Sequence, residues 1–144
     1  TLQQQGATVT ALVVSTVAGT GREGFKDGPA LEAQFGGVCG LGVCPVTGNI
    51  VFSDYNNHRI RTVTPQGQVI TLAGSDKDDS EDGTGSAASF CLPQGLCITS
   101  NGTIFVADTN NGLIRRITPQ GFLSSHLPFS SLFSVLIDWL VQGL

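Results

Sequence analysis

The sequence predicts an all-β fold built from two consecutive copies of one repeat unit, and three observations lead to this prediction. First, the stretch DYNNHRIRTVTPQG at 54–67 returns as DTNNGLIRRITPQG at 108–121. Second, apolar residues in these stretches fall near every second position, which is strand periodicity rather than helix periodicity. Third, the 144 residues include 19 glycines and only 12% charged residues, a composition that suits short strands joined by tight turns.

The interval between the two copies changes by one residue along the chain. From Asp54 and Asp108 onward, matching residues are 54 positions apart, whereas upstream, at Gly40 and Gly95, the interval is 55. The additional residue fits best in the turn CPVTG at 44–48, because a slip inside a strand would send every later side chain to the wrong face. We therefore expect two units of the same fold that differ by one residue in a turn.

Each copy is expected to form a four-stranded antiparallel meander. Asn101 and Gly102 lie between two apolar runs, and this dipeptide is the one most typical of a tight hairpin turn. Such a meander buries its faces only against neighbouring copies, which is the outline of a β-propeller blade. The predicted strands lie at 40–43, 49–54, 59–64 and 68–74 in the first copy, and at 95–98, 103–108 and 113–118 in the second.

Two blades do not close a propeller, which needs about four to eight of them. The chain is therefore interpreted as a partial β-propeller, a fragment or truncated product of a larger one. Open strand edges at 8–19 and 113–127 would present unpaired backbone groups, which are a template for association with another chain. Self-association of the fragment through these open blade edges is expected.

The repeat also sets the predicted domain boundaries. The last 23 residues contain three of the eight Phe and the only Trp. A short helix is a possible structure for this tail. Their apolar run at 132–141 is shorter than the about 20 residues of a membrane-spanning helix, so no membrane span is predicted. The predicted segments are an outer strand of a preceding blade at 8–19, a first repeat at 20–74, a second repeat at 75–121 and an atypical apolar tail at 122–144.

The stretch NNHRIR at 56–61, with GNIVFSDY before it and TVTPQG after it, resembles the NHL repeat, which is named after its Asn-His-Leu signature. The second copy matches as well, except that Gly112 stands where His is usual. The resemblance covers about residues 14–121 and implies a β-propeller fold. It implies much less about activity, because one fold hosts many functions.

The meander predicts which loops share one end of the blades. The loop between the second and third strands should lie beside the loop that connects one blade to the next, which places 19–34, 55–58, 74–89 and 109–112 together. Long loops gathered on a rigid scaffold are the usual place for recognition. The alternative is that these loops have only a structural role and cap the blades. The candidate binding residues on this face are Arg22, Lys26, Tyr55, Asn56, His58, Thr109 and Asn110.

Six residues recur at matching positions and are interpreted as a structural signature. A residue repeated in every blade is a poor catalyst candidate, since only one blade's copy would act. The pair Asp27-Gly28 returns as Asp82-Gly83 and is explained as a turn. No catalytic residue, metal ligand or cofactor is predicted. The signature consists of Asp54, Asn57, Arg61, Asp108, Asn111 and Arg115.

The charge of the chain indicates which class of partner it binds. The chain has 7 Lys and Arg against 11 Asp and Glu, and DKDDSED at 76–82 places five acids on the candidate face. Because phosphate neutralisation supplies much of the affinity for nucleic acids, nucleic-acid binding is disfavoured and a protein partner is expected. The predicted function is a non-catalytic interaction module. The alternative is a fragment of a propeller enzyme, a metal-dependent lyase or hydrolase whose ligands lie in absent blades.

The cysteines favour an intracellular location over a secreted one. The spacings C-x4-C at 39–44 and C-x5-C at 91–97 fall at non-equivalent positions of the two copies and match no zinc or redox motif. Cys97 is expected to be a buried thiol inside a strand. The stretch NGT at 101–103 argues against an intracellular location. It is a glycosylation sequon if the chain is secreted and a hairpin turn otherwise.

Overall fold

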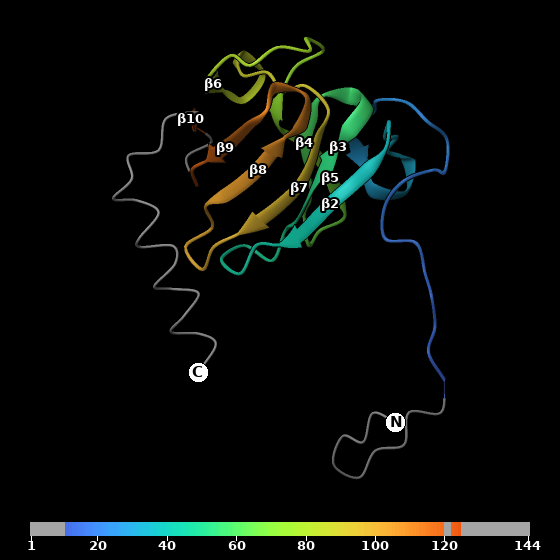
Figure 1. The fold of residues 1–144 in the computed structure, drawn as a ribbon. Coiled ribbons are helices and arrows are strands. Elements are labelled where there is room, and N and C mark those ends of the chain that lie inside the picture. Colours follow the sequence, from blue (N-terminus) through green and yellow to red (C-terminus); the bar gives the residue numbers. More distant parts are fainter. Residues whose placement is uncertain (1–10, 120–121, 125–144) are drawn as a thin grey trace.

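A computed structural model of the chain describes residues 11–119 and 122–124, and it confirms the all-β, propeller-type fold. Two antiparallel sheets of five strands each stand side by side (Figure 1). We call them blade 1, with the strand order β1-β5-β4-β3-β2, and blade 2, with the order β6-β10-β9-β8-β7. The four main strands of blade 1 are β2 (Val38–Val43), β3 (Ile50–Asp54), β4 (Arg59–Val63) and β5 (Gln68–Gly74), and those of blade 2 are β7 (Pro93–Ile98), β8 (Ile104–Asp108), β9 (Leu113–Ile117) and β10 (Phe122–Ser124).

The four main strands of each blade form the predicted meander. Successive strands pair with one another from the inner strands β2 and β7 to the outer strands β5 and β10. The hairpin predicted at Asn101 and Gly102 joins β7 to β8. Gly102 has a φ of 86°, which residues other than glycine rarely adopt. The turn is closed by the backbone hydrogen bond from Gly102 N to Thr99 O, 2.9 Å.

A fifth, two-residue strand on each sheet was not predicted. β1 (Gly28–Pro29) and β6 (Gly83–Thr84) come from the loop before each blade and pair with the outer strands β5 and β10. Short 3-10 turns complete the chain: η1 (Ala30–Glu32) and η3 (Gly85–Ala87) follow these strands, and η2 (Tyr55–Asn57) and η4 (Thr109–Asn111) connect the second main strand of each blade to the third.

These two short strands correct the predicted open edge at 113–127. β9 is paired on both sides, and β10 lies between β9 and β6. Because β10 begins at Phe122, the first three residues of the predicted tail 122–144 are part of blade 2. Residues 125–144, with the short helix expected there, lie outside the described residues.

The strand predicted at 8–19 does not form in this chain over its described part, 11–19. Leu12, Val13 and Val14 are 90%, 89% and 98% exposed. A strand needs a neighbour to accept its backbone hydrogen bonds. Ala18 packs against the cluster of blade 1 that contains Phe52, but no strand of the described residues pairs with this segment. Its assignment to a preceding blade stays a prediction.

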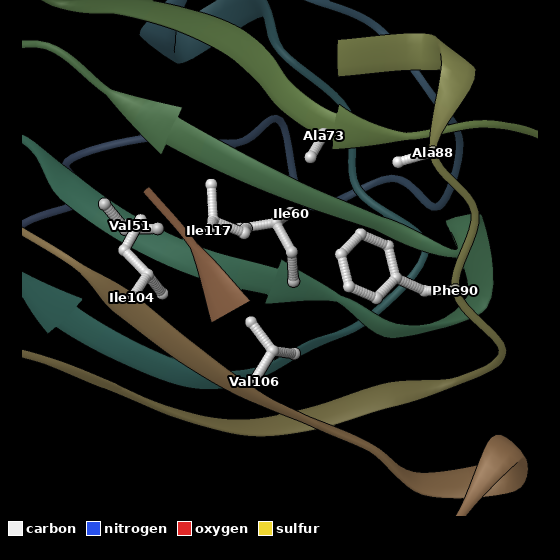
Figure 2. Packing of buried hydrophobic residues seen from close by; sticks show 8 residues of the cluster. All are labelled: Val51, Ile60, Ala73, Ala88, Phe90, Ile104, Val106 and Ile117. Atoms are coloured by element: carbon white, nitrogen blue, oxygen red, sulfur yellow. The ribbon is translucent and has the colours of Figure 1, made fainter. Parts of the chain in front are cut away.

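The core lies between the two blades, and Figure 2 shows its eight buried side chains pointing toward one another. The connecting loop contributes Phe90, which is fully buried; burial of a side chain of this size stabilises the fold by about 1.5–3 kcal/mol. Blade 1 contributes Val51, Ile60 and Ala73, blade 2 contributes Ile104, Val106 and Ile117, and the loop contributes Ala88 and Phe90.

A second cluster covers the other side of blade 1. There Phe52, Val63 and Val69 pack against Ala30 and Ala33 of the loop before the blade. We call the face of a blade that its own preceding loop covers the leading face, and the opposite face the trailing face. The core of Figure 2 is therefore the trailing face of blade 1 packed on the leading face of blade 2.

The inner strands β2 and β7 approach closely at Gly40. A Cβ at this position would lie 2.5 Å from the Gln94 carbonyl oxygen and 2.9 Å from Gly95 Cα. Both neighbours are backbone atoms, which cannot rotate away. Two residues along, a Cβ at Gly42 would lie 3.4 Å from the flexible Ile98 side chain, an ordinary contact. Blade packing therefore requires glycine at Gly40.

We expect Gly40→Ala to lower the free energy of unfolding by about 1–3 kcal/mol, the usual cost of overpacking. Gly42→Ala on the same strand is the matched control and should change it by less than about 0.5 kcal/mol. Urea unfolding of the full chain, followed by circular dichroism, measures both values. Equal losses in the two variants would contradict the close backbone approach.

Candidate protein-binding face

The loops that the meander places at one end do meet there. The loop that carries β6 and the turns after β3 and β8 lie at the top of the sheets in Figure 1, and the tight turns lie at the bottom. In blade 1, the Tyr55 amide donates to Gly37 O at 2.7 Å and Asn57 Nδ2 donates to Gly24 O at 2.8 Å. In blade 2, the Asn110 amide donates to Cys91 O at 3.1 Å.

A buried ion pair in blade 1 holds these loops to the sheet. Arg61 Nη1 donates to Asp54 Oδ2 at 2.5 Å, and both side chains are fully buried. Arg61 Nη2 also donates to Asp27 Oδ1 at 2.7 Å. The other oxygen of Asp54 accepts the Gly36 amide at 2.7 Å, and Asn57 Nδ2 donates to Asp54 Oδ2 at 2.9 Å. We call this set of contacts the brace, because it fixes the preceding loop and η2 to the blade.

Blade 2 contains the same brace at the equivalent positions. Arg115 Nη1 donates to Asp108 Oδ2 at 2.8 Å, and Arg115 Nη2 donates to Asp82 Oδ1 at 2.9 Å. Asp108 also accepts the Cys91 amide and Asn111 Nδ2, each at 2.8 Å. The structure thus places all six residues of the proposed signature in these two networks.

The sequence analysis missed the carboxylates that complete the brace. Asp27 and Asp82 had been assigned to a turn, whereas each carboxylate accepts a hydrogen bond from the buried arginine of its blade. Asp27 Oδ2 also accepts the amide and the hydroxyl of Thr71 on β5, at 3.1 and 2.9 Å. The signal was present in the sequence, since Asp27 and Asp82 keep the same interval of 55 residues as the other upstream repeat positions.

Several of the candidate binding residues already have partners within the protein. Asn56 Nδ2 donates to Gly36 O at 2.5 Å, and Lys26 Nζ lies 3.4 Å from the Glu32 carboxylate, with both side chains exposed. Tyr55 is half-buried at the start of η2. His58 Nδ1 accepts the Leu92 amide at 3.2 Å.

The His58 contact links the two blades. His58 has a left-handed φ of 55°, as Gly112 does in the second copy with 65°. The imidazole spans from the end of η2 in blade 1 to the chain entering β7 in blade 2. A histidine at this position therefore contributes a hydrogen bond between blades that Gly112 has no side chain to make.

The remaining candidates are exposed but do not share one pocket. Arg22 lines a hollow of about 300 Å³ with Glu23 and Val38 on the leading side of blade 1. Thr109 and Asn110 are exposed on η4 at the far blade. The seven residues therefore lie on one end of the molecule without converging on a single site.

A larger groove runs between the two inter-blade loops, and sequence reasoning did not find it. It has a volume of about 580 Å³ and is lined by Phe25 and Asp27 of one loop and by Asp76, Lys77 and Glu81 of the other. We call it the inter-loop groove. Its floor includes Arg59 and Thr71, which lie on the two outer main strands of blade 1.

The groove presents an aromatic ring beside mixed charges. The Arg59 guanidinium lies 4.1 Å from the centre of the Phe25 ring, an attractive cation–π arrangement, and it donates to Asn57 O at 2.8 Å. Asp76 and Glu81 are exposed carboxylates on the opposite wall. The groove can therefore accept an apolar group beside Phe25 and a positively charged group beside Asp76 and Glu81.

All four cysteines are free thiols, and Cys97 is exposed rather than buried as predicted. It points from the trailing face of blade 2, on which no described residue packs as a further blade. Burial raises the pKa of the Cys44 thiol, but hydrogen bonds from the Thr47 hydroxyl and from the Thr47 and Val46 amides outweigh it and lower the pKa below its ordinary value.

A metal site and a membrane-spanning helix are both absent from the described residues. No group of three or more His, Cys, Asp or Glu side chains among them is arranged to hold a metal ion. Within the same part of the chain, no helix has the length and apolar character needed to cross a membrane.

Two packed antiparallel meanders, each fed by a loop that crosses from one blade to the next, define a β-propeller-type repeat protein. Residues 90–117 match the sequence model of the NHL repeat. These residues are thus an NHL repeat, and the chain is similar to NHL repeat-containing proteins.

Several known proteins share this similarity. The chain is 42% identical over 95 residues to the protein SUPPRESSOR OF QUENCHING 1, chloroplastic, of Arabidopsis thaliana, which covers 65% of the chain and 9% of that protein. It is 42% identical over 72 residues to NHL repeat-containing protein 2 of Homo sapiens, which covers 50% of the chain and 10% of that protein. The chain therefore corresponds to about a tenth of the length of these relatives.

Solved structures agree on the fold. A putative phosphatase from Bacteroides thetaiotaomicron superposes with a TM-score of 0.62 at 25% identity, over 78% of this chain and 27% of that one. An auxiliary nutrient binding protein from the same organism superposes with a TM-score of 0.60 at 29% identity, over 69% of this chain and 27% of that one.

We expect Asn57→Ala and Asn111→Ala to lower the free energy of unfolding by similar amounts, about 1–3 kcal/mol each. Each change removes two hydrogen bonds, one to the buried carboxylate of its brace and one to a loop carbonyl. Asn110→Ala is the control, since its side chain is exposed beside Asn111; it should have little effect. Chemical unfolding of the three variants tests this. A loss in only one copy would contradict equivalent braces.

We expect Asp54→Asn to cost about 3–5 kcal/mol, because it leaves the buried Arg61 guanidinium without its closest counter-charge. Asp27→Asn should cost less, about 1 kcal/mol, because the Asp27 side chain is 40% exposed and water can compensate. The comparison uses thermal and urea unfolding of the full chain. If Asp27→Asn were the more damaging change, the buried pair would not be the principal contact of the brace.

Proposed function

We propose that the chain is a non-catalytic protein-interaction module whose partner binds at the loop end of the blades. The observation that carries this proposal is the inter-loop groove, a hollow of about 580 Å³ between two loops at that end. The brace arginines hold the backbone of both loops, since Arg61 Nη2 donates to Lys26 O at 2.9 Å and Arg115 Nη2 donates to Glu81 O at 3.0 Å. Rigid loops lose little conformational entropy on binding, which favours affinity.

The chemistry of the groove indicates the kind of partner. Its second wall belongs to the loop 76–82, which carries five acids and one lysine, and Asp76 and Glu81 line the hollow itself. Electrostatic complementarity between partners supports specificity and fast association. We therefore infer that the groove accepts a segment of a protein partner with a Lys or Arg side chain next to an apolar one, which packs on Phe25.

The observed geometry gives less support to the enzyme alternative, a metal-dependent lyase or hydrolase. Asp54 and Asp108 are fully buried carboxylates, each paired with an arginine. A general acid or base must reach the substrate, and these two carboxylates face their braces instead. The acidic loop also disfavours nucleic acid as the partner.

A peptide-display selection on the immobilised full chain should enrich sequences that contain a basic residue flanked by apolar residues. One enriched peptide is then synthesised and its affinity measured by calorimetry. The double variant Asp76→Asn and Glu81→Gln should weaken binding by about tenfold, which corresponds to 1.4 kcal/mol. These two carboxylates were chosen because no hydrogen bond of the brace depends on their side chains; only the backbone carbonyl of Glu81 takes part.

Glu32→Gln is the matched control, since Glu32 is an exposed acid outside the groove. It should leave the peptide affinity unchanged, and circular dichroism should show the same fold for all variants. Equal affinity of the wild type and the double variant, or a selection that enriches no basic peptide, would contradict a peptide site in this groove.

A further inference from the structure

The contact between the two blades is directional. Leu96 and Ile98 project from the leading face of blade 2 and pack on the core cluster. Opposite them, on the trailing face of blade 1, a Cβ at Gly42 would lie 3.4 Å from the Ile98 side chain and 3.6 Å from the Leu96 side chain. Gly40 lets the two inner strands meet through their backbones. Large side chains on a leading face thus fit a strip of glycine on a trailing face.

Large apolar side chains recur at the same positions of blade 1, where no described residue packs over them as a blade. Leu41 and Val43 occupy the positions of Leu96 and Ile98, and they lie on the leading face because they pair with Phe52 and Ile50. They are 61% and 59% exposed, whereas Leu96 and Ile98 are partly buried. The leading face of blade 1 therefore carries the projecting half of a blade contact without its counterpart among the described residues.

The trailing face of blade 2 carries the receiving half. Ile114 occupies the position of Ile60, yet Ile60 is fully buried and Ile114 is 60% exposed. Gly95 occupies the position of Gly40, and a Cβ there would meet no atom within 4 Å, in contrast to the 2.5 Å contact at Gly40. The space that the neighbouring blade fills at Gly40 is open at Gly95.

We propose that a second copy of this chain docks here head to tail, with the leading face of blade 1 in one copy on the trailing face of blade 2 in the other. The template for this contact is present inside the chain, where blade 2 sits on blade 1. On the receiving side Gly95 and Ile114 match Gly40 and Ile60, whereas Cys97 stands at the position of Gly42. The interface is heterologous, because two different surfaces meet. Copies joined in this way continue the row of blades and form a closed ring if the rotation between blades closes.

This surface differs from the strand edges that the sequence suggested. Two residues of each outer strand pair with β1 or β6, and the proposed contact is made by blade faces rather than by strand edges. Leu41, Ile114 and Gly95 are also outside the lining of the inter-loop groove. Docking between copies and binding of a partner in the groove therefore use separate surfaces.

The contact between copies should be weaker than the contact between the blades of one chain. Ser53 donates from its hydroxyl to Gln94 O across the blades, and His58 accepts the Leu92 amide. At the trailing face of blade 2 these positions hold Ala107 and Gly112, which have no side-chain polar group. Two hydrogen bonds between blades are thus missing, and the assembly should dissociate on dilution.

Light scattering coupled to size-exclusion chromatography, on the full 144-residue chain over a dilution series, measures the assembly. The wild type should exceed the monomer mass at high concentration and approach it on dilution. Gly95→Val, which fills the receiving side, and Leu41→Asp, which charges the projecting side, should each raise the concentration for half-assembly by about tenfold or more. Ile70→Asp is the control, because Ile70 is 49% exposed on β5 outside both docking surfaces, and it should behave as the wild type.

Mixing the two variants tests the head-to-tail arrangement. Gly95→Val retains an intact leading face and Leu41→Asp retains an intact trailing face, so an equimolar mixture should form a one-to-one dimer and nothing larger. A wild type that stays monomeric at every concentration would overturn the proposal. So would an assembly whose mass neither variant changes, or a mixture that gives no dimer. Circular dichroism confirms that each variant is folded before mixing.

Discussion

The ion pair between Asp54 and Arg61, with its copy between Asp108 and Arg115, is the constraint on which the rest of this structure depends. A fully buried pair is costly to desolvate, and it is retained only when the remaining hydrogen-bonding groups find partners. Here the second carboxylate, the loop amide and the asparagine supply most of those partners. As a result, the loop before each blade is tied to its sheet, and the two loops place Phe35 and Phe90 against the faces that they cover.

The brace also connects stability to recognition. Asp27 belongs to the brace through Arg61 and Thr71, and it lines the inter-loop groove with Thr71. A partner that occupies the groove would therefore touch a wall whose backbone and side chains are already fixed. The exposed acids on the other wall are not tied in this way, so they can adapt to the partner while the first wall stays in place.

The sequence was enough to predict the all-β fold, the two meanders, the end of the molecule at which the loops gather, and the family. These follow from periodicity and from an exact interval, which are local or repeated signals. Residues 11–19 form no strand among the described residues, and β10 pairs with β6 at the edge that was expected to be open. Both differences arise because pairing depends on which neighbour is present. β1 and β6 have two residues each, too few to show any periodicity. The contact between Asp27 and Arg61 was not predicted because the two residues are 34 positions apart. The groove and the exposure of Cys97 arise from the packing of loops and blades, which no single stretch of sequence encodes.

The pairing of β1 with β5, and of β6 with β10, brings the beginning of each repeat against its end. Each unit is thereby fastened to itself by backbone hydrogen bonds, independently of the side chains of its neighbours. A gene segment that encodes one such unit can be copied in tandem, and the new protein segment contains the two strands that pair its beginning with its end. Growth of a blade array by duplication therefore needs only two compatible faces, and those faces can diverge afterwards one residue at a time.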